Sequence, residues 1–150
     1  WLWVFNKDGW TDKGVYVIQD RDAIGRSQLF DINALEKALE GGKEVGGIRF
    51  SKDGSVRFAP KGSYMLGEHT PESFAKDGFI IVSCGKEGAE KLGEVSATFG
   101  NKPYTYGLEI QEGQTPELRV SAVNEKGDRL RFVGDCWSDY YGGRAFGVLK

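Results

Sequence analysis

The chain has 150 residues, of which 39% are hydrophobic and 28% are charged, which is enough apolar material for one buried core and too much for a disordered segment. The formal net charge is −2, with lysines and arginines interspersed among acids, and this pattern argues against a nucleic-acid partner and a membrane surface. No apolar run approaches the roughly 20 residues that a membrane-spanning helix needs. We therefore expect a single globular domain over residues 1–150, with no nucleic-acid binding and no membrane insertion.

The amino-terminal segments WLWVFNKDGW (1–10) and GVYVIQ (14–19) predict a strand, a turn and a second strand. Alternation along the first strand places one set of aromatic residues on a common face, which we expect to be core: Trp1, Trp3 and Phe5. Trp10 lies in the predicted turn, so we expect it to be exposed. The chain begins with Trp rather than Met, which favours a processed, secreted protein, although an artificial boundary would explain the same start.

The segment DINALEKALEGG (31–42) predicts a helix. Asp31 is the expected N-cap, and the two glycines at 41–42 are expected to end the helix. Leucines at positions 35 and 39 continue the apolar face that Ile32 begins. This helix is predicted to pack against a sheet.

The segment IRFSKDGSVRF (48–58) predicts a β-hairpin. If all its apolar side chains share one face, the loop is 52–54, Phe50 pairs with Val56, and Gly54 adopts a left-handed conformation. This register also places two arginines, Arg49 and Arg57, opposite each other on the outer face. Such a pair is unfavourable unless an acid such as Glu44 or a bound anion lies over it, or unless both side chains extend into water.

The tag Phe-x-Lys-Asp-Gly occurs at 5–9, 50–54 and 74–78. Its unequal spacing excludes a solenoid or propeller repeat, so we interpret the tag as turn chemistry. Around its third copy, TPESFAKDG (70–78) predicts a short helix, with Thr70 as N-cap, Pro71 as first residue and Gly78 as C-cap. The following residues predict a strand over 79–84 (FIIVSC) and a helix over 86–95.

A second hairpin is predicted in RVSAVNEKGDRLRF (119–132), with the loop at 125–127 and the pairs Ala122–Leu130 and Val120–Phe132. Further strands are predicted at the segments TYGLEIQ (105–111), ELRVSAV (117–123), DRLRFVGDCW (128–137) and RAFGVLK (144–150). The predicted fold class is α+β: a curved, hairpin-rich antiparallel sheet with one or two packed helices. A β-barrel or β-sandwich with a helical insertion is the alternative.

Residues suited to catalysis or metal binding are scarce. Cys84 and Cys136 allow one disulfide, but two buried thiols explain them equally well. His69, the single histidine, is expected to be an exposed loop residue near a helix N-cap. A pair of His69 with either thiol is conceivable, as is a pair of carboxylates drawn from Glu68, Glu72, Asp135 and Asp139. Cysteine and histidine supply three zinc ligands at most, which is too few for a zinc site of these residues alone. We therefore predict no metal, and we assign no catalytic residue and no cofactor.

The segment GDCWSDYYGGR (134–144) has the composition of a recognition surface, because large aromatic rings are uncommon on loops. Tyrosine, tryptophan and arginine dominate binding hot spots, and carboxylates and arginine suit polar contacts. The predicted binding residues are Asp135, Trp137, Asp139, Tyr140, Tyr141 and Arg144. Alternatively, the tryptophan ends the preceding strand inside the core and the tyrosines cover a barrel mouth.

These patterns favour a non-enzymatic binding or interaction module that presents the aromatic segment to a partner. A protein partner is preferred over a carbohydrate, because the sequence shows no regular ladder of exposed aromatic residues. A small hydrolase that uses carboxylates or a Cys–His pair is the second hypothesis, and a structural subunit of a larger assembly is the third.

Overall fold

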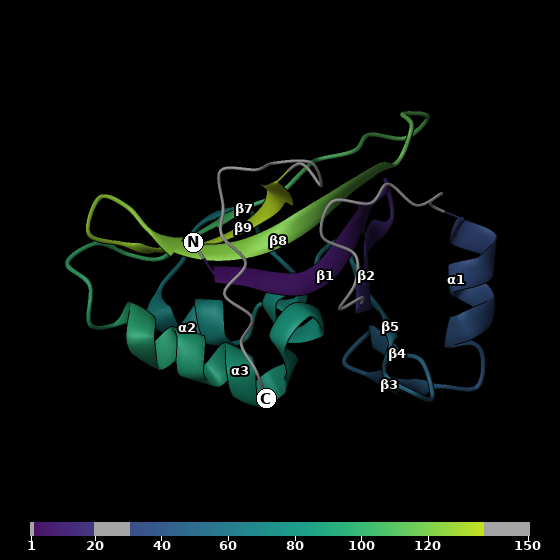
Figure 1. Cartoon of the computed structure of the whole chain (residues 1–150), viewed down its shortest axis with the longest axis horizontal. Helices are drawn as coiled ribbons and strands as arrows, with labels where there is room; N and C mark the ends of the chain where they lie inside the picture. Colours follow the sequence, from purple (N-terminus) through teal and green to yellow (C-terminus); the bar gives the residue numbers. More distant parts are fainter. Residues whose placement is uncertain (1, 20–30, 137–150) are drawn as a thin grey trace.

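The computed structural model describes residues 2–19 and 31–136, without the side chains of Leu2, Trp3 and Phe5 (Figure 1). The described strands form one open sheet in the order β3-β4-β5-β2-β1-β8-β9-β7-β6, and all neighbours are antiparallel except β7 and β9. The strands are β1 (Leu2–Trp10), β2 (Gly14–Gln19), β3 (Lys43–Val45), β4 (Ile48–Phe50), β5 (Val56–Pro60), β6 (Gly67–Glu68), β7 (Tyr104–Tyr106), β8 (Glu117–Glu125) and β9 (Leu130–Cys136). The predicted α+β class and antiparallel sheet are confirmed, whereas these strands close no barrel and stack into no sandwich.

The described helices are α1 (Ile32–Leu39), α2 (Pro71–Ala75) and α3 (Gly78–Ser96). They cover different faces of the sheet, because successive residues of a strand point to opposite sides. Tyr16 and Phe58 pack with α1, whereas their neighbours Val15 and Ala59 belong to the core that α3 covers. Figure 1 shows α2 and α3 together below the long strands and α1 apart at the other end. None of the helices in the described part of the chain has the length and apolar character to cross a membrane.

Local signals place the starts of α1 and α2 where the sequence predicts them. The Asp31 side chain accepts hydrogen bonds from the first turn of α1. Thr70 and Ser73 form a reciprocal capping box at the start of α2, and Pro71 is its first residue. Gly78, however, is the first residue of α3 rather than the C-cap of α2, because Asp77 caps a new helix immediately.

The strand predicted over 79–84 is wrong, because these residues form the first turns of α3. Short apolar runs fit a buried helix as well as a buried strand, and the Asp77 cap selects the helix. The helix breaks at Gly85, whose φ of 78° and ψ of 165° are not helical. Arg57 Nη1 donates to Val82 O at 2.9 Å and Asn6 Nδ2 donates to Ser83 O at 2.9 Å. These two side chains therefore replace helical partners that the break removes.

The predicted register of the first hairpin is also wrong. Phe50 pairs with Arg57 and Arg49 pairs with Phe58, so the two arginines lie on opposite faces. Both faces of this hairpin are covered, one by α1 and the other by α3, so its apolar residues need not share a face. Gly54 does adopt the predicted left-handed conformation, with φ of 73°.

The second hairpin differs in the same way, since Ala122 pairs with Val133 and Glu125 pairs with Leu130. Its register changes between Val120 and Ala122, where a bulge interrupts the ladder. Strand β7 is shorter than predicted and ends at Tyr106. The strand predicted over 144–150 lies outside the described residues.

The first copy of the tag lies in the middle of β1 and forms no turn, so the turn interpretation fails there. Lys7 and Asp8 are buried within the strand, and the chain reverses over 11–14 instead. Trp10 is 0% exposed, contrary to the prediction, and its indole Nε1 donates to Gly134 O at 2.8 Å. The predicted core face of Trp1, Trp3 and Phe5 lies outside the described side chains.

Candidate functional site

The predicted contact segment is described at its beginning only. Asp135 lies near the end of β9 and is half-buried. Burial raises the pKa of its carboxyl, an effect that the positive charges of Arg119 and Arg131 oppose. The remaining predicted contact residues lie outside the described part of the chain: Trp137, Asp139, Tyr140, Tyr141 and Arg144.

A row of tyrosine and arginine side chains lies on the strand that leads to Asp135 and on its neighbour. Strands β7 and β9 pair in parallel, with Tyr104 opposite Arg131 and Thr105 opposite Phe132. Thr105 and Phe132 are fully buried, and Phe132 contacts α3 through the main core. Alternation therefore places the tyrosine–arginine row, which we define as Tyr104, Tyr106, Arg129 and Arg131, on the sheet face opposite α3.

The four side chains of the row contact one another. The ring centroids of Tyr104 and Tyr106 are 4.5 Å apart and their planes differ by 35°, so the rings lie against each other rather than side by side. The guanidinium carbon of Arg129 is 5.7 Å from the centre of the Tyr104 ring, and that of Arg131 is 5.4 Å from the centre of the Tyr106 ring. All four residues are half-exposed. The row thus combines cation–π contacts with open access to solvent.

This geometry leaves polar groups for a ligand rather than flat ring faces. Each ring already has a second ring and a guanidinium group beside it. The groups that remain are guanidinium N–H donors and the phenol hydroxyls, which suit hydrogen bonds to a polar or anionic surface. The sequence prediction missed this row because each residue looks like an ordinary outward-facing strand position. The alternating patterns YTY (104–106) and RLR (129–131) were its only sequence signal.

His69 is buried, contrary to the predicted exposed loop position, with 3% of its surface exposed. Its Nε2 lies 2.7 Å from Met65 O and its Nδ1 lies 2.9 Å from Ser73 Oγ. Since a carbonyl oxygen only accepts, the neutral imidazole carries its proton on Nε2, and Nδ1 accepts from the Ser73 hydroxyl. Asp77 Oδ2 is 3.6 Å from Nε2. The three side chains form a line of serine, histidine and aspartate.

The same cluster has a structural role. Asp77 Oδ1 accepts from the N–H groups of Phe79 and Ile80, and Oδ2 accepts from Met65 N at 2.9 Å. Burial raises the pKa of Asp77, while these hydrogen bonds oppose the rise, as His69 does when its ring is protonated. The cluster therefore joins the loop before β6 to the start of α3.

Cys84 and Cys136 form no disulfide, and neither is a hydrogen-bonding partner of His69. Burial, followed by the negative charges of Asp135 and Asp8, raises the pKa of Cys136 to about 11, which disfavours the nucleophilic thiolate. Within residues 2–19 and 31–136, no group of three or more histidine, cysteine, aspartate or glutamate side chains is placed to hold a metal ion. The Cys–His hypothesis thus gains no support from these contacts.

The chain matches no family model, no curated protein and no solved structure, so its own residues and geometry are the basis for a functional assignment.

Proposed function

We propose that the chain is a non-enzymatic binding module whose contact surface is the sheet face that carries the tyrosine–arginine row. The observation that supports it is the pair of tilted, half-exposed tyrosine rings in contact, each with a guanidinium group near it. Tyrosine and arginine supply large contact area and directional donors, and they are over-represented among residues that dominate binding energy.

A protein partner fits this surface better than a carbohydrate. Sugar recognition by aromatic residues relies on open ring faces, whereas Tyr104 and Tyr106 lie against each other. The exposed guanidinium groups instead suit the carboxylates and carbonyl oxygens that a protein surface offers.

The predicted contact residues Asp135, Trp137, Asp139, Tyr140, Tyr141 and Arg144 remain part of this proposal. Strand β9 carries Arg131 and Asp135 and ends at Cys136, so the aromatic segment follows directly in sequence from the strand that bears the row. We propose that it extends the same contact surface.

A random-peptide library displayed on phage tests the proposal. We expect selected peptides to lose about thirtyfold in affinity, or about 2 kcal/mol, when Tyr104 is replaced by Ala or Arg131 by Gln, because such residues act as hot spots. The Tyr140→Ala/Tyr141→Ala double variant is expected to weaken binding with an unchanged melting temperature. Isothermal titration calorimetry measures the affinities.

The matched control is Lys86→Gln, which changes an exposed residue of α3 on the other side of the sheet and should leave binding unchanged. Selected peptides that bind all variants equally would place the contact surface elsewhere. A glycan array that retains the protein while the peptide library yields no binder would favour a carbohydrate ligand instead.

One observation favours a second candidate function, a serine hydrolase. Ser73 is exposed, and its hydroxyl donates to an imidazole that has Asp77 on its far side. However, Ser73 and His69 line neither the hollow beside Met65 nor the hollow beside Lys52. The Ser73 hydroxyl also serves the capping box of α2.

A fluorophosphonate probe distinguishes the two functions. We expect no label on Ser73, because neither hollow reaches it and its hydroxyl already serves the cap of α2. Mass spectrometry of the labelled protein measures this. A label on Ser73 that disappears in His69→Gln, with the chain still folded by circular dichroism, would establish the hydrolase.

A further inference from the structure

We infer that the partner of this module presents a carboxylate to Arg129 and Arg131, and that Glu68 holds part of that position in the free protein. The inference rests on the proposed function, since it concerns the same sheet face, and it adds the chemistry of the partner.

In two other arginines of this chain, the guanidinium group donates hydrogen bonds to acceptors within the protein. Arg49 donates two hydrogen bonds to the Glu36 carboxylate, from Nη1 to Oε1 at 3.1 Å and from Nη2 to Oε2 at 2.8 Å. Arg57 donates from Nε to Gly54 O at 3.0 Å and from Nη1 to Val82 O at 2.9 Å. Both therefore use their guanidinium groups to hold the fold.

Arg129 and Arg131 differ. Arg131 donates from Nε to Asn124 Oδ1 at 2.7 Å, which fixes the side chain and leaves both Nη groups available. No described residue accepts a hydrogen bond from the Nη atoms of either arginine. Because a carboxylate accepts two parallel N–H donors from one guanidinium group, these groups match a carboxylate in shape as well as in charge.

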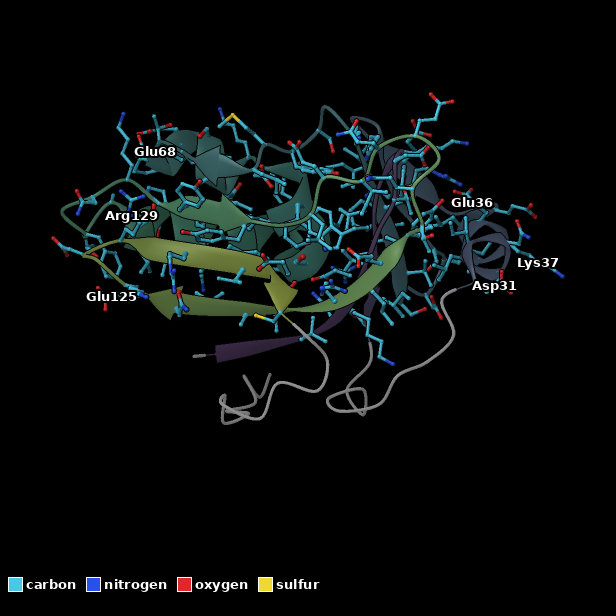
Figure 2. All side chains as sticks on the ribbon, turned by 90° about the horizontal axis from the view of Figure 1, so that it is seen from above. Asp31, Glu36, Lys37, Glu68, Glu125 and Arg129 are labelled. Atoms are coloured by element: carbon cyan, nitrogen blue, oxygen red, sulfur yellow. The ribbon has the colours of Figure 1, made fainter. Side chains whose placement is uncertain are left out.

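Glu68 is the internal competitor. Its Oε2 lies 3.7 Å from Arg129 Nη2, which is close enough for attraction and too far for a hydrogen bond. Figure 2 shows Glu68 and Arg129 near each other at one end of the molecule, and Glu36 on α1 at the other end. Glu68 is 53% exposed and Arg129 is 27% exposed, so this contact is held weakly and an incoming carboxylate is able to replace it.

The surroundings favour a carboxylate-bearing peptide over a nucleic acid. Glu125 ends β8, Asp128 lies in the turn that leads to Arg129, and Glu68 lies beside Arg129. The row of negative charges on a nucleic-acid backbone would be repelled by these acids. A single carboxylate can contact the two guanidinium groups without lying against the acids.

Nuclear magnetic resonance of the arginine Nε–H groups tests the inference directly. The probe is a synthetic peptide in which glutamate alternates with glycine, and its matched control replaces every glutamate with glutamine. We expect the glutamate peptide to shift the signals of Arg129 and Arg131 and to leave those of Arg49 and Arg57 in place. The glutamine peptide should shift none of them.

Substitution of Glu68 gives a second and more specific test of the inference. Glu68→Gln should raise affinity for the glutamate peptide about two- to fivefold, the range expected for an exposed ion pair. Glu72→Gln removes the same charge from an exposed position of α2 and should leave affinity unchanged. Arg129→Gln should lower affinity about tenfold, as the loss of a charged hydrogen bond predicts.

Three outcomes would overturn the inference. They are equal effects of Glu68→Gln and Glu72→Gln, an absence of arginine shifts at millimolar peptide, or tighter binding of oligothymidylate or a phosphopeptide. If library-selected peptides still bind this face in a manner that Tyr104→Ala weakens, the proposed function survives and only the carboxylate assignment fails.

Discussion

Replacing Asp77 with Ala is expected to lower the free energy of unfolding by about 3 kcal/mol, because the change removes a buried helix N-cap and the acceptor of the part-buried Met65 N–H group. One oxygen of this buried carboxylate caps α3 through Phe79 N and Ile80 N, and the other accepts from Met65 N. The substitution thus removes partners from two segments at once. Urea unfolding followed by circular dichroism measures the loss.

Asp31→Ala is the matched control, because Asp31 caps α1 through Asn33 N and Ala34 N but is exposed. Water is able to replace its hydrogen bonds, so a loss of about 1 kcal/mol is expected. Asp77→Asn keeps one carbonyl oxygen for the cap and should lie between the two. Equal losses for Asp77→Ala and Asp31→Ala would show that neither the burial of the Asp77 cap nor its hydrogen bond from Met65 N adds to stability.

Local signals explain why the helix starts were predictable from sequence. Asp31 and Thr70 each cap a helix through hydrogen bonds that span only a few residues, so the information lies within one short segment. The strand registers were not predictable in this way. The hairpin at Phe50 and Arg57 is covered on both faces by helices that lie elsewhere in the chain, so the one-face assumption behind the predicted register fails.

The contact segment predicted from sequence and the tyrosine–arginine row share strand β9 but rest on different signals. The composition of GDCWSDYYGGR points to residues that follow β9, and Asp135 lies on the strand that carries Arg131. The tyrosine–arginine row forms only because β7 and β9, distant in sequence, pair in parallel. The contact between Tyr104 and Arg131 could not be predicted from a hairpin turn or from the alternation of residues within one strand.

The buried carboxyl of Asp8 predicts a gain in stability on substitution. Burial raises its pKa well above the usual value, and the Ser121 hydroxyl, which donates to Oδ2, opposes only part of that rise. No described residue donates to Oδ1. The folded protein therefore keeps Asp8 protonated at a pH where the unfolded chain has released the proton, and folding takes up that proton.

The sign of the pH dependence follows. Because the folded pKa lies above the unfolded one, the contribution of Asp8 is greatest below the unfolded pKa and is lost as pH rises towards the folded pKa, at about 1.4 kcal/mol per pH unit. Asp8→Asn carries no such proton. We expect its free energy of unfolding to increase relative to that of the wild type as pH rises above the unfolded pKa, as urea titrations at each pH would measure.

Asp53 supplies a control of opposite sign on the same protein. Hydrogen bonds from the Ser55 N–H group, the Ser55 hydroxyl and the Ser51 hydroxyl lower its pKa to about 2. Its contribution is therefore present above the unfolded pKa and is lost as pH falls towards 2, so Asp53→Asn should destabilise at pH 7 and lose its effect in acid. If Asp8→Asn and Asp53→Asn changed stability with the same pH slope, burial would not be what sets the charge of Asp8.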